Sequence, residues 1–207
     1  MKTFYAFVLL AFLGLVILGC SESTDQLVAP VEKVSTLSLE KGIIHSATGS
    51  AHWKTVALTG QTNFKYSFSA IICNDGTVTG ELVSTAKGLF LFEKANVYDL
   101  DIENNNMAKL AFHFTKGDLG QYYNPPVNID AIYGWLVVID NGEGNNAAGP
   151  DMGSLILFTD GSDIPGKTIS EIDNMGPQEL LDWIVATFGI PYELLISPID
   201  QGSVQVR

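Results

Sequence analysis

Cysteine, histidine and basic residues are scarce in this sequence. The 207 residues include two cysteines and three histidines, and 11 Lys and Arg side chains stand against 23 Asp and Glu. Two cysteines cannot form the framework of a disulfide-rich scaffold. The net charge of −12 argues against binding to nucleic acid or, through charge, to anionic lipid head groups, and it favours cations or a basic partner. The histidines lack the short mutual spacings that zinc sites use (His45, His52, His113).

An apolar run opens the chain. It extends from Phe4 to Gly19 and ends directly before Cys20. A membrane-spanning helix needs about 20 apolar residues, and this shorter run after a basic residue is typical of a secretory signal. Its end, Ile17 to Cys20, resembles the bacterial lipobox, in which the cysteine receives a diacylglycerol before the chain is cut. The sequence predicts a lipoprotein signal peptide at residues 1–19. An ordinary signal peptide, or an N-terminal anchor with an incidental cysteine, is the alternative.

Cys20 is therefore the predicted lipidation site and the first residue of the mature protein, which acyl chains hold to a membrane. Ser21 follows, and the absence of Asp there resembles the pattern of lipoproteins sorted to the outer membrane of the cell envelope. Either a periplasmic or a surface-exposed position fits. Residues 20–44 are small, polar and acidic, which predicts a flexible tether. With Cys20 taken by lipid, Cys73 is expected to be a free, partly buried thiol.

Residues 45–207 are predicted to form a single domain. From Phe64 to Ile72, apolar side chains fall at every second position, which is the mark of a half-buried strand. Asn74-Asp75-Gly76 then supplies a hairpin turn. Many short strands joined by turns, with no alternation of strand and helix, predict an all-β, mainly antiparallel fold, either a meander barrel or a sandwich. Ala131 to Asp140 is apolar on both faces, so we place it centrally in the sheet.

One helix is predicted, near residues 177–188. Pro177 suits the first helical position, and Gly189 followed by Pro191 suits the end. We expect this helix to pack against an open end or one edge of the sheet. Apolar residues recur in it at helical spacing (Leu180, Leu181, Ile184, Val185, Phe188).

Two segments match nucleotide-binding patterns, and their context argues against both. Gly161 to Thr168 reads GSDIPGKT and fits the phosphate-loop pattern. A phosphate loop needs a helix directly after it and amides that face the phosphates, but Pro165 removes an amide and Gly176-Pro177 stops any helix soon afterwards. Gly142 to Ala147 mimics the dinucleotide fingerprint without the βαβ unit. We expect no nucleotide to bind, and a loop at Gly161 to Thr168.

The most unusual local composition is VVIDNGEGNNAAGPD, residues 137–151. Roughly six to eight oxygen ligands at about 2.4 Å surround a bound Ca²⁺, and this bendable segment is rich in such oxygens, although its spacing is not that of an EF-hand. Two interpretations stay open: a calcium site, and a structural loop in which Asn and Asp side chains bond their own backbone. The candidate metal ligands are Asp140, Asn141, Glu143, Asn145 and Asp151.

Three segments in this order resemble a family of uncharacterised secreted bacterial β-domains. They are Gly49 to Trp53, Phe64 to Gly80 and the D-N-G-E-G-x-N run at residues 140–146. Family members have an F-x-F-[ST]-A strand in the second segment, where this chain has Tyr66 as the first aromatic residue. The resemblance implies an all-β exported domain and a fixed role, structural or ligand-binding, for residues 140–146. It implies no activity.

The functional hypothesis from sequence is a membrane-anchored extracytoplasmic lipoprotein of the cell envelope that serves as a non-catalytic binding or envelope-structural module. A β-barrel carrier of a small hydrophobic ligand is the first alternative, because barrels of about eight strands can hold one ligand. A hydrolase with a carboxylate-based site is the second, although no pair can be chosen among 23 acidic residues. No catalytic residue is assigned, and the protein or small-ligand partner is unidentified.

Overall fold

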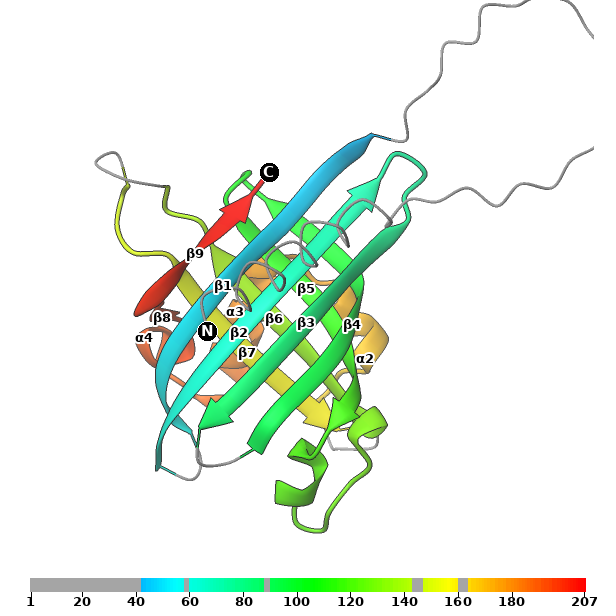
Figure 1. The fold of residues 1–207 in the computed structure, drawn as a ribbon, viewed down its shortest axis with the longest axis vertical. Helices are drawn as coiled ribbons and strands as arrows, with labels where there is room; N and C mark the ends of the chain where they lie inside the picture. Colours follow the sequence, from blue (N-terminus) through cyan, green and yellow to red (C-terminus); the bar gives the residue numbers. More distant parts are fainter. Residues whose placement is uncertain (1–41, 58–59, 88–89, 143–146, 160–163) are drawn as a thin grey trace, which may run out of the picture.

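Nine strands form one antiparallel sheet that curls into an incomplete barrel (Figure 1). The computed structural model describes residues 42–57, 60–87, 90–142, 147–159 and 164–207. Strands β1 to β7 follow one another as a meander, and β9 returns to pair with β1. The all-β, mainly antiparallel prediction is confirmed. The strands are β1 Ile43–Ala57, β2 Gly60–Cys73, β3 Val78–Lys87, β4 Phe90–Glu103, β5 Met107–Gly117, β6 Ile132–Ile139, β7 Met152–Thr159, β8 Ser197–Pro198 and β9 Gln201–Val206.

The concave face of the sheet forms the larger of two apolar cores. Alternation places every second side chain of a strand on this face, so β2 contributes Tyr66, Phe68 and Ala70. Small residues lie opposite large rings: a Cβ at Gly134 would lie 2.3 Å from the Phe112 ring. The interior is therefore filled by rings that need glycine beside them. Other members are Ala47, Ala51, Leu82, Ala95, Val97, Leu100, Ala108, Leu110, Phe114, Ile132, Leu136, Val138, Ile199, Val204 and Val206.

Three helices cover the outer face of β5 to β7 and form the second core. They are α2 Ile169–Asp173, α3 Pro177–Phe188 and α4 Tyr192–Leu195, and they lie behind the sheet in Figure 1. The bounds predicted for α3 are confirmed, whereas its predicted position at an end or edge is wrong. Because β5 and β6 are apolar on both faces, the outer face needs a cover. That core contains Met107, Ala111, Trp135, Val137, Ile156, Ile172, Met175, Leu180, Leu181, Ile184 and Ile196.

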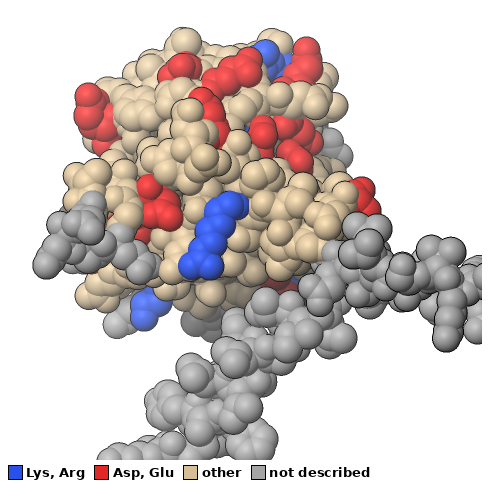
Figure 2. All heavy atoms as spheres, turned by 90° about the horizontal axis from the view of Figure 1, so that it is seen from above, with Lys and Arg blue, Asp and Glu red and all other residues tan. Residues whose placement is uncertain are grey.

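Three further features bear on function. Strand β1 begins at Ile43, so the sheet starts inside the range predicted as tether. Acidic side chains are spread over the face seen in Figure 2, with few basic ones among them. Within the described ranges, no helix combines the length and apolar character that a membrane span requires.

Candidate functional site

The aspartates of the predicted calcium loop hold the last strand of the sheet. The Asp140 Oδ2 atom accepts a hydrogen bond from the Val206 amide at 3.0 Å, and the Asp151 Oδ2 atom accepts one from the Val204 amide at 2.8 Å. Both amides belong to the edge of β9 that does not pair with β1, because an antiparallel strand donates to each side alternately. Two carboxylates thus bridge β9 to the connection between β6 and β7.

The other carboxylate oxygens of these aspartates shape the loop itself. The Asp140 Oδ1 atom accepts from the Gly142 amide at 2.8 Å, and the Asp151 Oδ1 atom accepts from the Asn141 amide at 3.0 Å. The Asn141 side-chain amide donates to the Pro150 carbonyl at 2.6 Å. This is the bonding that the structural-loop interpretation predicts.

The calcium interpretation is not tested by these contacts. Glu143 and Asn145 lie outside the described residues, so the structure brings together only Asp140, Asn141 and Asp151 of the five candidate ligands. Elsewhere in the part of the chain that the structure describes, no three His, Cys, Asp or Glu side chains converge as metal ligands would.

Thr168, the last residue of the phosphate-loop match, is the N-cap of helix α2. The Glu171 amide donates to the Thr168 hydroxyl at 3.2 Å, and the Thr168 amide donates to Glu171 Oε2 at 2.8 Å, which is a reciprocal capping box at the start of α2. The helix that follows has five residues. Gly161 and the two residues after it lie outside the described ranges. The threonine of the pattern therefore begins a short helix.

The prediction of a free thiol at Cys73 is wrong. Its side chain is buried at the end of β2, as predicted, but it is disulfide-bonded, and the described residues contain no free cysteine. The chain has one other cysteine, Cys20, which lies outside the described residues. Sequence reasoning assigned that thiol to lipid and so left Cys73 without a partner.

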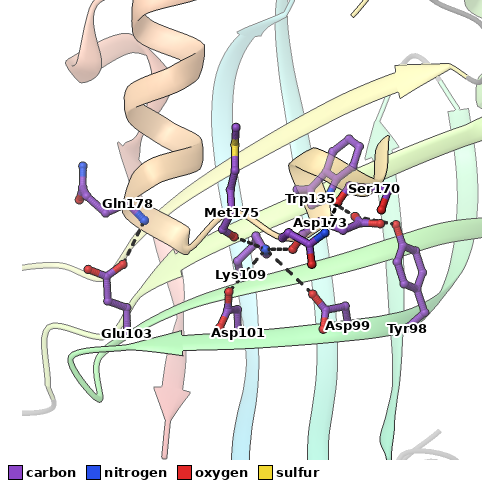
Figure 3. Close-up of polar contacts among 11 residues, drawn as sticks. Tyr98, Asp99, Asp101, Glu103, Lys109, Trp135, Ser170, Asp173, Met175 and Gln178 are labelled. Carbon is purple, nitrogen blue, oxygen red and sulfur yellow. Dashed lines mark hydrogen bonds and ion pairs between the residues drawn. The ribbon is translucent and has the colours of Figure 1, made fainter. Parts of the chain in front are cut away.

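Lys109 is a fully buried cation between the sheet and the helices (Figure 3). Its Nζ atom donates to the carbonyls of Asp173, at 2.5 Å, and Met175. The Asp173 carbonyl belongs to the last residue of α2 and the Met175 carbonyl lies two residues later, at the end of the helix where the dipole favours positive charge. The carboxylates of Asp99 and Asp101 lie 4.0 and 3.6 Å from the same nitrogen. Lys109 therefore joins the end of α2 to β4 and β5.

The Asp173 carboxylate completes this contact. Its Oδ1 atom accepts from the Trp135 indole at 2.8 Å and from the Tyr98 hydroxyl at 3.1 Å. Burial raises the pKa of Asp99, Lys109 opposes that rise, and the Asp101 carboxylate adds to it. At the start of α3, the Gln178 amide donates to Glu103 Oε2 at 3.3 Å (Figure 3). These contacts attach the helical layer to the sheet.

A second buried ionisable group lies on the concave face. Tyr66, Ser84 and Glu93 face one another across β2, β3 and β4, and they are exposed by only 4%, 2% and 0%. We call these three residues the polar row. It runs through an interior that is otherwise apolar, and it ends at Gly117 on β5, which is paired with Glu93.

The backbone after β5 wraps around the Glu93 carboxylate. Its Oε1 atom accepts from the amides of Asp118, at 3.1 Å, and Leu119, at 2.8 Å. Gly117 has φ +143°, and a Cβ there would lie 1.7 Å from Glu93 Oε2. Only glycine fits this close approach in that backbone conformation.

One carboxylate oxygen of Glu93 and one of Asp118 have no hydrogen-bond partner. Glu93 Oε2 and Asp118 Oδ1 are both buried without a hydrogen-bond donor. Burial raises the pKa of Glu93, the amides of Leu119 and Asp118 lower it, and the charge and side-chain hydrogen bond of Asp118 raise it, for a value of about 7. Two carboxyl groups can share a hydrogen bond only when one is protonated. A proton on Glu93 would give both of these oxygens a partner. Burial, and then the Glu93 charge, also raise the pKa of Tyr66.

Sequence reasoning missed both buried ionisable groups. Glu and Lys are mostly exposed in proteins, which favours placing them on the solvent side. The signal was their phase: Glu93 alternates in step with Ala95 and Val97, and Lys109 in step with Met107 and Ala111.

Comparisons with protein-family models, curated proteins and solved structures found no match to this chain. The resemblance to secreted β-domains thus stays a prediction.

Proposed function

We propose that this protein is a lipid-anchored extracytoplasmic lipoprotein, placed at the outer membrane, whose β-domain acts as a non-catalytic binding or envelope-structural module. The observation that carries the proposal is the lipobox-like run from Ile17 to Cys20, which precedes a chain whose sheet begins at Ile43. Such an order is that of a signal, an anchor, a spacer and a folded domain.

The roles of the charged side chains support a module without catalysis. Lys109, Glu103 and Asp173 attach helices to the sheet, and Asp140 and Asp151 hold β9. Catalytic carboxylates need access to substrate, whereas these groups contact backbone and neighbouring side chains. The acidic surface visible in Figure 2 also favours a partner other than nucleic acid.

A carrier of a small hydrophobic ligand is the second candidate. The curled sheet with an apolar concave face favours it, since small barrels of this kind can hold one ligand. The close contact of Gly134 with the Phe112 ring weighs against it, because the space is occupied by side chains. Native mass spectrometry of the purified chain separates the two: a non-covalent mass of a few hundred daltons supports a carrier, and the bare polypeptide mass contradicts one.

The anchor is tested by expressing the full chain in a two-membrane bacterium, with Cys20→Ser and the matched control Cys73→Ser. We expect the wild type and C73S to fractionate with the outer membrane and to carry a diacylglycerol on an N-terminal Cys20. C20S should lose both properties. A wild-type chain that lacks lipid and yields a peptide with Cys20 bonded to Cys73 would contradict the proposal.

A further inference from the structure

We infer that Glu93 and Asp118 form a proton-operated latch that holds residues 118–131 over one end of the sheet interior. This segment contains two short 3-10 turns, η2 Leu119–Tyr122 and η3 Ile129–Ala131. They are the green turns at the lower end of the sheet in Figure 1. The inference does not depend on the lipid anchor or on the identity of a partner.

The segment is an apolar cover. Leu119, Tyr123, Val127 and Ile129 are partly buried and pack against the interior core. Within the segment, the Gly120 carbonyl accepts from the Val127 amide at 3.0 Å. If the cover moved outward, these side chains and the end of the interior beneath them would meet water, so its position decides whether that end is accessible.

Glu93 holds the start of this cover from inside. In its protonated form, Oε2 donates to Asp118 Oδ1, which gives both otherwise orphaned oxygens a partner, while Oε1 keeps the amides of Asp118 and Leu119. All four polar groups are then satisfied. This closed arrangement needs one proton and no other ligand.

Loss of that proton removes the hydrogen bond between Glu93 and Asp118. Two carboxylates then face one another without a donor in a buried position, which is costly in the dry interior and is relieved if Asp118 moves out to water. Among the described side chains, the ionisable groups that act on Glu93 from packed elements are Tyr66 on β2, whose raised pKa keeps it neutral, and Asp118 itself. His113, which contacts the Asp130 carbonyl from the outer face, is a separate tie on the same segment.

The direction of the pH effect follows from the difference in the Glu93 pKa between the closed and the open latch. The pKa of Glu93 is about 7 when the latch is closed, against an ordinary value of 4.5, so opening releases a proton between those values. The opening constant should rise roughly tenfold per pH unit between about pH 5 and about pH 6.5, and level off above about pH 7. The latch is thus tight in acid and loose at neutral pH.

Hydrogen exchange of the full chain, read by mass spectrometry from pH 5 to 8 and corrected for intrinsic exchange, tests this. We expect peptides covering residues 118–131 to lose protection by roughly fortyfold between about pH 5 and about pH 7 in the wild type. Glu93→Gln should abolish the pH dependence, because the amide donates to Asp118 at every pH. It should leave the His113 contact with the Asp130 carbonyl unchanged.

Two more variants complete the design. Asp118→Asn also supplies a permanent donor and should flatten the same profile, which keeps the test decisive if Glu93→Gln does not fold. Glu103→Gln, a carboxylate that caps α3, is the matched control and should retain the wild-type profile in this segment. Constant protection across the pH range in the wild type, or an equal pH response in the wild type and in a folded E93Q or D118N variant, would overturn the inference.

Discussion

At the scale of the residue, the molecule places two ionisable groups, Lys109 and Glu93, where sequence statistics would place apolar ones. Each is 0% exposed, and each is surrounded by backbone groups of a segment distant in sequence. The hydrogen bonds that such a buried group makes are directional, whereas an apolar contact is not. Lys109 and Glu93 therefore fix where α2 and the β5–η2 connection sit on the sheet.

Replacing Lys109 with methionine tests this role. The Asp173 and Met175 carbonyls would lose their buried donor, and Asp99 and Asp101 their counter-charge, so the free energy of unfolding should fall by roughly 2 kcal/mol or more. Urea unfolding of the purified domain measures it.

The matched control is Lys65→Met, at an exposed position of β2. That change should stay within about 0.5 kcal/mol. Equal effects of the two substitutions would show that Lys109 acts only as a filler of space.

At the scale of the element, local patterns were predictable and the partners of each element were not. The bounds of α3 follow from Pro177, Gly189 and the apolar spacing between them, all of which are local signals. Helix α2 was missed because its five residues are too short to show a period. The position of α3 was wrong because it depends on which sheet face lacks a cover. The sequence of β6, which is apolar on both faces, indicates that a second face must be covered. Only the pairing of the strands shows which part of the sheet that is.

The edge of β9 makes a second element-scale prediction. Asp140→Asn and Asp151→Asn each place an NH₂ group or a neutral oxygen against a strand amide, so each should cost about 1–2 kcal/mol of unfolding free energy. The amides of Val206 and Val204 respectively should lose their protection from hydrogen exchange. Asp130→Asn, at an exposed position, is the control and should change neither.

The same proteins separate the calcium hypothesis from the structural one. If the loop holds Ca²⁺ as well, EDTA should lower the melting temperature of the wild type and not that of the two variants. If the aspartates act only through β9, EDTA should leave the wild type unchanged while the variants remain destabilised.

At the scale of the whole molecule, the raised pKa of Glu93 links stability to pH. Folding raises this pKa from 4.5 to about 7, so the native state holds a proton that the unfolded chain releases. The Glu93 contribution is complete below about pH 4.5 and is lost as pH rises to about 7, by up to roughly 3 kcal/mol. Urea unfolding at several pH values checks the slope against E93Q, in which this fall should be absent. A wild type and variant with parallel pH profiles would contradict it.

The pairing of β1 with β9 also dictates the order of assembly. Ser46 and Arg207 exchange backbone hydrogen bonds of 2.8 and 2.9 Å, although almost the whole domain separates them along the chain. Contacts of such sequence separation form late and slow folding. A chain still emerging from a ribosome or a translocation channel can build the meander from β2 onward, but one side of β1 stays unpaired until β9 has emerged. A chain from which β9 (residues 201–206) is deleted should therefore fold with an unpaired edge on β1, and such an edge favours aggregation.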